Sequence, residues 1–191
     1  MSNRRVSLVE VYMLSLEEIG QSVRNNIQLI LDNIQLPLAV GPISDDDYRI
    51  LSGGFGQLEW DYALATYGND ESKFELCIKF VAHGAIQGVP DGAALCVFDT
   101  EGHTFNIHMI ERFTRDDEQH PLNGRMVLIT LMSAYMFCKA VECGEIRIIE
   151  PVPELLAYYT SFGFVLDDNG YVMVCETTTI EAVFLKFAQL G

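Results

Sequence analysis

The segment 150–164 constrains the fold of this chain more than any other part of the sequence. It follows a short apolar run, 145–149, that is typical of a buried strand. Proline lacks a backbone N–H and is tolerated where a helix begins, so Pro151 and Pro153 predict a helix start. Gly163 suits the left-handed position after a last helical turn. The segment therefore predicts a short helix between two strands.

The N-terminal part of the chain is predicted to begin with an amphipathic helix. Ser15 and Glu18 form a capping box, in which each side chain can bind a backbone amide left free where a helix begins. Apolar residues then recur at helical spacing over 19–34. The acidic run 45–47 and the glycine-rich stretch 52–56 predict loops. The second lacks the lysine of a phosphate-binding loop, so we interpret it as a plain turn.

The rest of the sequence predicts strands followed by alternating helices and strands. Aromatic and β-branched residues dominate 59–67 and 73–82, which are separated by turn-forming residues and predict a hairpin. The runs 92–99 and 104–113 predict a second hairpin. The elements expected after it are a helix capped by Asn123 and stopped by Gly144, a strand over 145–149, a helix over 153–162, a strand over 170–176, and a helix over 179–189 after a second capping box, Thr178 with Glu181. This order is that of an α+β fold.

Composition limits what the chain can bind. Its 191 residues suffice for a single domain with a sizeable core. It carries 12 basic and 27 acidic residues, a formal net charge of −15. Such a charge repels phosphate backbones, so we expect no nucleic-acid partner. The negative charge has two interpretations, solubility or the attraction of a cationic substrate such as a polyamine, an aminoglycoside or a lysine tail.

The cysteine, histidine and hydropathy patterns indicate the cellular compartment in which the protein is expected. Five cysteines without a CxxC pair and four scattered histidines predict neither disulfides nor a metal site. The basic N-terminus is followed by glutamates and does not read as a signal peptide. The longest uncharged apolar stretch, 126–138, is too short to span a bilayer. We therefore expect a cytoplasmic protein with no membrane partner.

The segment 150–164 resembles the helix-four region of the GNAT superfamily of acyl-CoA-dependent N-acetyltransferases. The family pattern there is roughly N-P-x-A-x-x-hydrophobic-Y-x-x-hydrophobic-G-F. Two of its positions are changed in this chain and the others are kept. In chain order, the aligned residues are Val152 in place of the asparagine, Pro153, Leu155 in place of the alanine, Tyr159, and Gly163 with Phe164.

The resemblance covers roughly residues 58–176. The expected order of antiparallel strands, long helix, parallel strand, short helix and last strand is similar to the GNAT core. It implies a mixed, mostly antiparallel central sheet flanked by helices. Residues 1–50 would form a helical extension packed on a GNAT-like domain over 51–191.

The resemblance also implies acetyl-CoA as co-substrate. In this family, small residues at the start of the long helix let backbone amides converge on the pyrophosphate, at the positive end of the helix dipole. The family pattern Q/R-x-x-G-x-G/A aligns with 121–126, where Gly124 is kept, Pro121 replaces the first polar residue and Met126 the last small one. The stretch can also be read as the plain start of a core helix. The implied CoA-binding residues are Leu122, Asn123, Gly124, Arg125 and Met126. In this family the fourth strand splays from the fifth and leaves a wedge for the pantetheine arm, which would lie beside Ile110, Arg112 and Phe113.

Amine acetylation needs a base for the ammonium and an acid for the departing thiolate. Tyr159 matches the family tyrosine often assigned the acid role. Glu111 and His108 are the candidate bases on the fourth strand. Each has a plainer interpretation, Glu111 as the partner of a neighbouring arginine and His108 as an ordinary strand residue. Trp60 and His83 are candidate walls of an acceptor pocket.

These observations lead us to expect an N-acetyltransferase that acts on a primary amine of a small molecule or peptide. Two alternatives stay open. A catalytically degenerate GNAT-fold protein, acting as a binding or regulatory module, would account for the eroded phosphate pattern. An acidic decoy that imitates nucleic acid would account for the charge, although its carboxylates gather in loops. The sequence does not fix the oligomeric state, and a homodimer is one option.

Overall fold

The computed structural model describes residues 14–67, 70–82 and 88–189. Within them, seven strands form one sheet in the order β1-β2-β3-β4-β5-β7-β6, and the pair β4–β5 is parallel while the others are antiparallel. The strands are β1 (Leu38–Gly41), β2 (Lys73–Ala82), β3 (Gly92–Asp99), β4 (Thr104–Arg112), β5 (Glu145–Ile149), β6 (Val165–Leu166) and β7 (Val172–Glu176). The expected mixed, mostly antiparallel sheet flanked by helices is confirmed.

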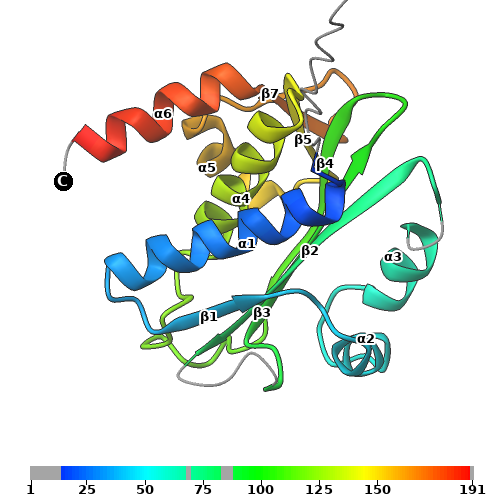
Figure 1. The fold of residues 1–191 in the computed structure, drawn as a ribbon, viewed down its shortest axis with the longest axis vertical. Coiled ribbons are helices and arrows are strands. Elements are labelled where there is room, and N and C mark those ends of the chain that lie inside the picture. Colours follow the sequence, from blue (N-terminus) through cyan, green and yellow to red (C-terminus); the bar gives the residue numbers. More distant parts are fainter. Residues whose placement is uncertain (1–13, 68–69, 83–87, 190–191) are drawn as a thin grey trace, which may run out of the picture.

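Helices cover both faces of the sheet (Figure 1). They are α1 (Leu16–Asn33), α2 (Asp45–Ser52), α3 (Trp60–Tyr67), α4 (Met126–Ala140), the 3-10 turn η1 (Pro153–Leu155), α5 (Leu156–Ser161) and α6 (Thr177–Gln189). Residues of α1, α4, α5 and α6 share one buried cluster, and α2 and α3 pack on the opposite face against β3. None of the helices in the described ranges has the length and apolarity that crossing a bilayer requires.

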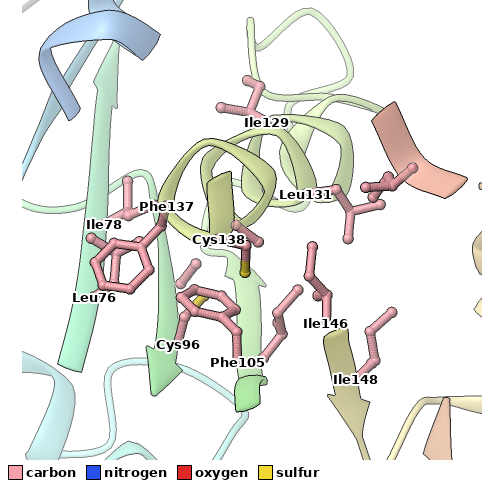
Figure 2. Packing of buried hydrophobic residues seen from close by; sticks show 14 of the residues in the cluster. Leu76, Ile78, Cys96, Phe105, Ile129, Leu131, Phe137, Cys138, Ile146 and Ile148 are labelled. Atoms are coloured by element: carbon pink, nitrogen blue, oxygen red, sulfur yellow. The ribbon is translucent and has the colours of Figure 1, made fainter. Parts of the chain in front are cut away.

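The larger core lies between α4 and the sheet, as Figure 2 shows. Phe137 of α4 is fully buried and stacks on Phe74 of β2, with ring centroids 5.5 Å apart and planes inclined by 6°. The hydroxyls of Thr130 and Ser133 donate to carbonyls one turn earlier on α4, each at 2.9 Å. Because these polar groups are satisfied within the helix, α4 can be buried on nearly all sides.

The N-terminal helix is confirmed, with its capping box. The backbone N–H of Ser15 donates to the Glu18 carboxylate at 2.7 Å, and the N–H of Glu18 donates to Ser15 Oγ at 3.2 Å. The buried face of α1, which includes Val23 and Ile27, belongs to the same cluster as α4. Helix α1 therefore contributes to the main core, and the expected boundary at residue 50 lies inside α2.

The predicted hairpin of 59–67 with 73–82 is wrong. Residues 60–67 form α3, and β2 pairs with β1 and β3. Trp60, Ala63 and Leu64 are buried against β3, and their spacing of three and four residues matches one face of a helix. The aromatic and β-branched composition indicated a strand, but burial of this helical face decides the structure.

The acidic run predicted as a loop is instead the first turn of α2. Ser44 and Asp47 form a second capping box, with Ser44 N–H donating to Asp47 at 2.8 Å and Asp47 N–H donating to Ser44 Oγ at 3.2 Å. Lys79 Nζ donates to both Asp47 carboxylate oxygens at 2.8 Å, and both side chains are buried. Acidic residues suit the positive end of the helix dipole, and the ion pair fastens α2 to β2.

Two other predicted caps are wrong. Helix α4 begins at Met126, and the Asn123 amide donates to a carbonyl five residues earlier instead of accepting from the helix. Helix α6 begins at Thr177, one residue before the predicted cap. The Glu181 carboxylate accepts a hydrogen bond from the Tyr135 hydroxyl at 2.7 Å, which ties α6 to α4. Glu181, which the local pattern assigned to a cap, therefore binds a tertiary partner instead.

Candidate functional site

Strands β4 and β5 separate in the middle of the sheet. Their parallel pairing ends with Ile107 opposite Ile148. Strand β4 continues to Arg112 and stays paired with β3 on its other side. The described strands therefore leave the edge of β4 beyond Ile107 without a partner on the β5 side. This is the splayed arrangement that the resemblance implied.

Two local features produce the separation. The pairing of β4 with β3 shifts at His108, an extra residue that makes a β-bulge and bends the strand. Strand β5 ends because Glu150 adopts a left-handed φ of 49° and Pro151 follows it. The N–H of Glu150 donates to the carbonyl of Tyr171 at 2.8 Å, which fixes this turn.

Three adjoining hollows follow the open edge. The first, which we call the α3 cleft, has a volume of about 400 Å3 and lies between α3, β4 and the end of β5. The second, the wedge, measures about 140 Å3 and lies between the separating strands. The third, the α4 hollow, measures about 340 Å3 and lies at the start of α4.

The hollows adjoin one another, since neighbours share lining residues. The α3 cleft and the wedge share Leu58, His108, Met109, Ile149 and Glu150. The wedge and the α4 hollow share Val127 and Leu155. An extended molecule can therefore lie along β4 from the start of α4 to the face covered by α3.

Tyr159 lines the wedge from α5. Its side chain is 4% exposed, and its hydroxyl has no hydrogen-bond partner within the described ranges. Burial, followed by the nearby Tyr158, raises the pKa of Tyr159 to about 12. The phenol is therefore protonated at neutral pH and can donate a hydrogen bond to a group bound in the wedge.

His108 lies where the wedge opens into the α3 cleft. Its imidazole packs on Tyr67, with ring centroids 4.3 Å apart. Burial, with a smaller effect of the Lys73 charge, lowers the pKa of His108 to about 4. The ring is therefore neutral at physiological pH and has a lone pair available for a proton or a hydrogen bond.

Glu111, the other candidate base, does not line the cleft or the wedge. Its carboxylate accepts from the N–H of Gln57 at 2.6 Å, the N–H of Leu58 at 3.2 Å and the indole Nε1 of Trp60 at 2.7 Å. It also pairs with Arg115. A buried carboxylate with four donors stabilises the segment before α3, so the geometry gives it no free lone pair for a substrate proton.

The start of α4 presents both satisfied and unsatisfied amides. The N–H of Leu122 donates to His120 Nδ1 at 3.2 Å, that of Asn123 to the His120 carbonyl at 2.9 Å, and that of Arg125 to the Leu122 carbonyl at 3.0 Å. The amides of Gly124, Met126 and Val127 have no acceptor within the described residues.

These three unsatisfied amides belong to residues that line the α4 hollow, together with Arg112. Gly124 has a φ of 68°, and a Cβ added there would meet no atom within 4 Å. The backbone is therefore open at this point. A helix N-terminus with an arginine beside it favours an anion.

The other implied CoA-binding residues are divided between this surface and other surfaces. Ile110 lines the wedge, and Leu122 and Met126 line the α4 hollow. The Arg125 side chain lies instead in a groove against α1 and donates to the Pro121 carbonyl. Phe113 packs its ring against Phe55, 5.0 Å away, on the α3 face. The Asn123 side chain caps the preceding turn.

Of the two expected acceptor-pocket walls, only Trp60 lies within the described residues, and it does not line the cleft. Trp60 is fully buried, and His83 lies outside the described residues. The cleft is lined instead by residues that the sequence analysis did not select, among them Glu59, Tyr62, Tyr67 and Glu150. A signal for Glu150 was present, because it ends a strand predicted to be parallel, and ligands gather at the carboxyl ends of parallel strands.

Solved structures share this architecture. The protein AtaT in complex with acetyl-methionyl-tRNAfMet superposes with a TM-score of 0.52 at 13% identity, covering 77% of this chain and 99% of AtaT. A tyrosine-to-phenylalanine mutant of the AtaT toxin, bound to the C-terminus of the antitoxin AtaR and acetyl-CoA, gives 0.51 at 11% identity, covering 78% and 98%. This chain has the GNAT fold. An uncharacterized protein from Bacillus halodurans is similar too, with a TM-score of 0.52 at 14% identity over 76% of this chain and 86% of its own.

The resemblance to GNAT proteins is thus confirmed at the level of the fold. No protein-family model matches the sequence, and no curated protein matches it. The GNAT fold is therefore reached here by a divergent sequence. Its splayed strands and the start of α4 still surround a set of adjoining hollows.

Proposed function

We propose that this protein is an N-acetyltransferase that transfers the acetyl group of acetyl-CoA to a primary amine. The observation that carries the proposal is the wedge between β4 and β5, with the unpartnered hydroxyl of Tyr159 lining it. The wedge connects an anion-binding surface at α4 to a separate cleft at α3. Such a path suits a long cofactor that meets an acceptor at its far end.

The phosphates of CoA would lie in the α4 hollow. The N–H groups of Gly124, Met126 and Val127 would bind the pyrophosphate. Arg112 lines the same hollow while its guanidinium donates to the carbonyls of Arg115 and Asp117, so it would contribute its charge at a distance and not a bidentate contact. The side chains of Leu122 and Met126 matter less here, because the backbone provides the hydrogen bonds. Arg125, Asn123 and Phe113 are not assigned to this site, since their side chains are engaged elsewhere.

The pantetheine arm would follow the open edge of β4 through the wedge, beside Ile110. The thioester then lies between Tyr159 and His108, which both line this hollow. A backbone N–H of β4 near the bulge would polarise the thioester carbonyl, as an oxyanion donor does. Bound acetyl-CoA in an AtaT structure of the same fold supports acetyl-CoA as the cofactor.

The reaction begins with an alkylammonium in the α3 cleft. The ammonium transfers one proton to the neutral His108 imidazole, which passes it to solvent. The free nitrogen lone pair then attacks the thioester carbon, and the C–S bond breaks. Tyr159 donates to the departing thiolate, and the second nitrogen proton replaces the one that it gives. The products are the N-acetyl amide, CoA thiol and one released proton.

A second candidate function is a GNAT-fold binding module without catalysis. The satisfied amides of Leu122, Asn123 and Arg125 favour it, because they reduce the number of donors available to a phosphate. An RNA acceptor, as in the AtaT complex with acetyl-methionyl-tRNAfMet, is disfavoured. The net charge of −15 and the glutamates in the α3 cleft would repel a phosphate backbone.

Calorimetric titration with acetyl-CoA tests the proposal through a matched pair of variants. We expect the wild type to bind with a Kd between about 1 µM and 1 mM, the usual range of KM values. Both asparagine and aspartate tolerate the left-handed backbone at Gly124. We expect Gly124→Asn to bind like the wild type and Gly124→Asp to bind at least about tenfold more weakly, because its carboxylate faces the pyrophosphate.

Two outcomes would argue against the enzyme. Absence of acetyl-CoA binding by the wild type would remove the proposed function. Binding without acetylation of any amine in a broad panel would support the non-catalytic module. Equal affinities of the two Gly124 variants would place the phosphates elsewhere, and a thermal melt of each variant checks that it is folded.

A further inference from the structure

The walls of the α3 cleft carry negative charge without a compensating cation. Its lining residues are Leu58, Glu59, Tyr62, Ala63, Tyr67, His108, Met109, Ile149 and Glu150. Two of them are carboxylates and none is lysine or arginine. Lys73 is close enough to influence His108 and Tyr67, but its charge is paired with Asp70 at 2.9 Å.

Glu150 is the carboxylate nearest to the proposed chemistry. It lines both the cleft and the wedge, whereas Glu59 lines the cleft alone. Within the described ranges, its carboxylate has neither a hydrogen-bond nor an ion-pair partner. Its backbone is held by the bond to Tyr171, so the side chain starts from a fixed point at the junction of the two hollows.

The field of Glu150 reaches across this junction. The pKa of Tyr67 is raised by burial first and then by Tyr62, is lowered in part by the charge of Lys73, and is raised again by the charge of Glu150. Tyr67 and Tyr62 both lie on α3 and line the cleft. Aromatic faces beside a carboxylate form a site that attracts an alkylammonium through cation–π contacts as well as ion pairing.

An independent observation points to a ligand at this junction. Tyr159 is 4% exposed, its hydroxyl has no hydrogen-bond partner in the described part of the chain, and it lines the same wedge as Glu150. A molecule bound in the wedge can therefore accept the hydrogen bond that no group of the described residues accepts. The two side chains therefore face one binding space from α5 and from the end of β5.

We propose that the acceptor is an alkylammonium with a second positive charge. Glu150 holds the reacting ammonium where the α3 cleft meets the wedge, and Glu59 holds the second charge further along the cleft. Tyr62 and Tyr67 cover the alkyl chain between them. This inference rests on the proposed acetyltransferase function and specifies its substrate class. A free polyamine and a lysine with a basic neighbour in a peptide share this chemistry.

Acetylation kinetics with two amines that share a four-carbon chain test the inference. The pair is 1,4-diaminobutane and 1-aminobutane, which differ in the second charge. Because the diamine offers two equivalent amines, kcat/KM is compared per amino group, and we expect the wild type to prefer the diamine by about fivefold, the effect of one partly exposed ion pair. Glu59→Gln should abolish this preference. Glu150→Gln should lower kcat/KM for both amines while the Kd for acetyl-CoA stays unchanged.

The control is Asp61→Asn, which removes a charge from α3 outside the lining of the cleft and should leave the preference intact.

A short lysine-arginine peptide is the third acceptor. A higher kcat/KM for this peptide than for the diamine identifies a peptide as the source of the dication, and a lower kcat/KM identifies a free polyamine. Wild-type preference for 1-aminobutane, or full activity of Glu150→Gln, would overturn the inference. In both cases bound acetyl-CoA and measurable acetylation would leave the proposed function standing. Acetyl-CoA binding without acetylation of any of the three acceptors would also overturn it.

Discussion

Tyr67 and His108 stack on each other in the α3 cleft, with ring centroids 4.3 Å apart and planes inclined by 32°. The tyrosine comes from the end of α3 and the histidine from the bulge in β4. This contact buries the imidazole and keeps it neutral, because the charged form would lose its hydration. The same contact also couples the stability of the fold to the pH.

The first prediction concerns this coupling. The pKa of His108 is about 4 in the folded protein against an ordinary 6.5, so the unfolded chain binds more protons between these values. The stability that the neutral His108 contributes to the free energy of unfolding is therefore fully present above pH 6.5 and is lost as the pH falls towards 4. Urea denaturation at pH 7 and pH 5 should show a smaller pH dependence for His108→Asn than for the wild type. The exposed His103 provides the control, since His103→Asn should keep the wild-type dependence.

The second prediction concerns Tyr159. If its hydroxyl stabilises the departing thiolate, Tyr159→Phe should lower kcat by about a hundredfold, the lower range for a positioned proton donor. The Kd for acetyl-CoA should stay within about twofold of the wild type, because the removed oxygen acts on a charge that develops during the reaction. Tyr48→Phe is the control, since Tyr48 is exposed on α2 and lines none of the three hollows. Equal activity of Tyr159→Phe and the wild type would contradict the assignment.

The third prediction separates a structural from a catalytic role of Glu111. Because its carboxylate satisfies three N–H donors and pairs with Arg115, Glu111→Gln should lower the free energy of unfolding by about 3 kcal/mol. Urea denaturation measures this loss. A variant with normal stability and no activity would instead restore Glu111 as the base.

The fourth prediction uses a glycine beside the same carboxylate. A Cβ on Gly56 would clash with the Glu111 carboxylate and come within 2.9 Å of the Phe113 ring. Gly56→Ala should therefore displace the segment before α3 and lower the melting temperature. Gly144→Ala is the matched control, since a Cβ there meets no atom within 4 Å. Similar melting temperatures of the two variants would show that the segment moves without cost.

Much of the fold could be predicted because local patterns and tertiary contacts agree. Strands β2, β3 and β4 follow the predicted runs, and the proline and glycine positions around Tyr159 match the short helix and its end. The failures arise where the two levels disagree. In α3, β-forming residue types obscured a stripe of Trp60, Ala63, Leu64 and Tyr67 at helical spacing, which the sequence already contained.

The site was predictable in outline and not in detail. The separation of β4 from β5 and the wedge position of Tyr159 follow from the resemblance. A neighbouring arginine was an expected partner of Glu111, and Arg115 is one. Its three N–H partners come from residues more than 50 positions earlier in the chain, and no local pattern indicates such contacts. The left-handed φ of Glu150 depends on the bond to Tyr171, so its place at the junction of the hollows required the structure.

The last prediction concerns the buried ion pair of Lys79 and Asp47, which joins β2 to α2. Both side chains are at most 3% exposed, so removing one partner leaves a charge buried without compensation. Lys79→Met should lower the free energy of unfolding by about 3–5 kcal/mol. The exposed pair of Arg49 with Asp46 on the same helix, also at 2.8 Å, is the control, and Arg49→Met should change stability little because water screens that pair.

A double-mutant cycle shows whether the loss comes from the pair itself. Asp47→Asn keeps a side-chain oxygen that can still accept from Ser44, so the capping box is largely retained while the charge is removed. The double variant with Lys79→Met has no buried charge and should be more stable than the sum of the two single losses implies. Strict additivity would mean that Lys79 acts through packing against β3 alone, and that α2 is held to the sheet by its apolar residues.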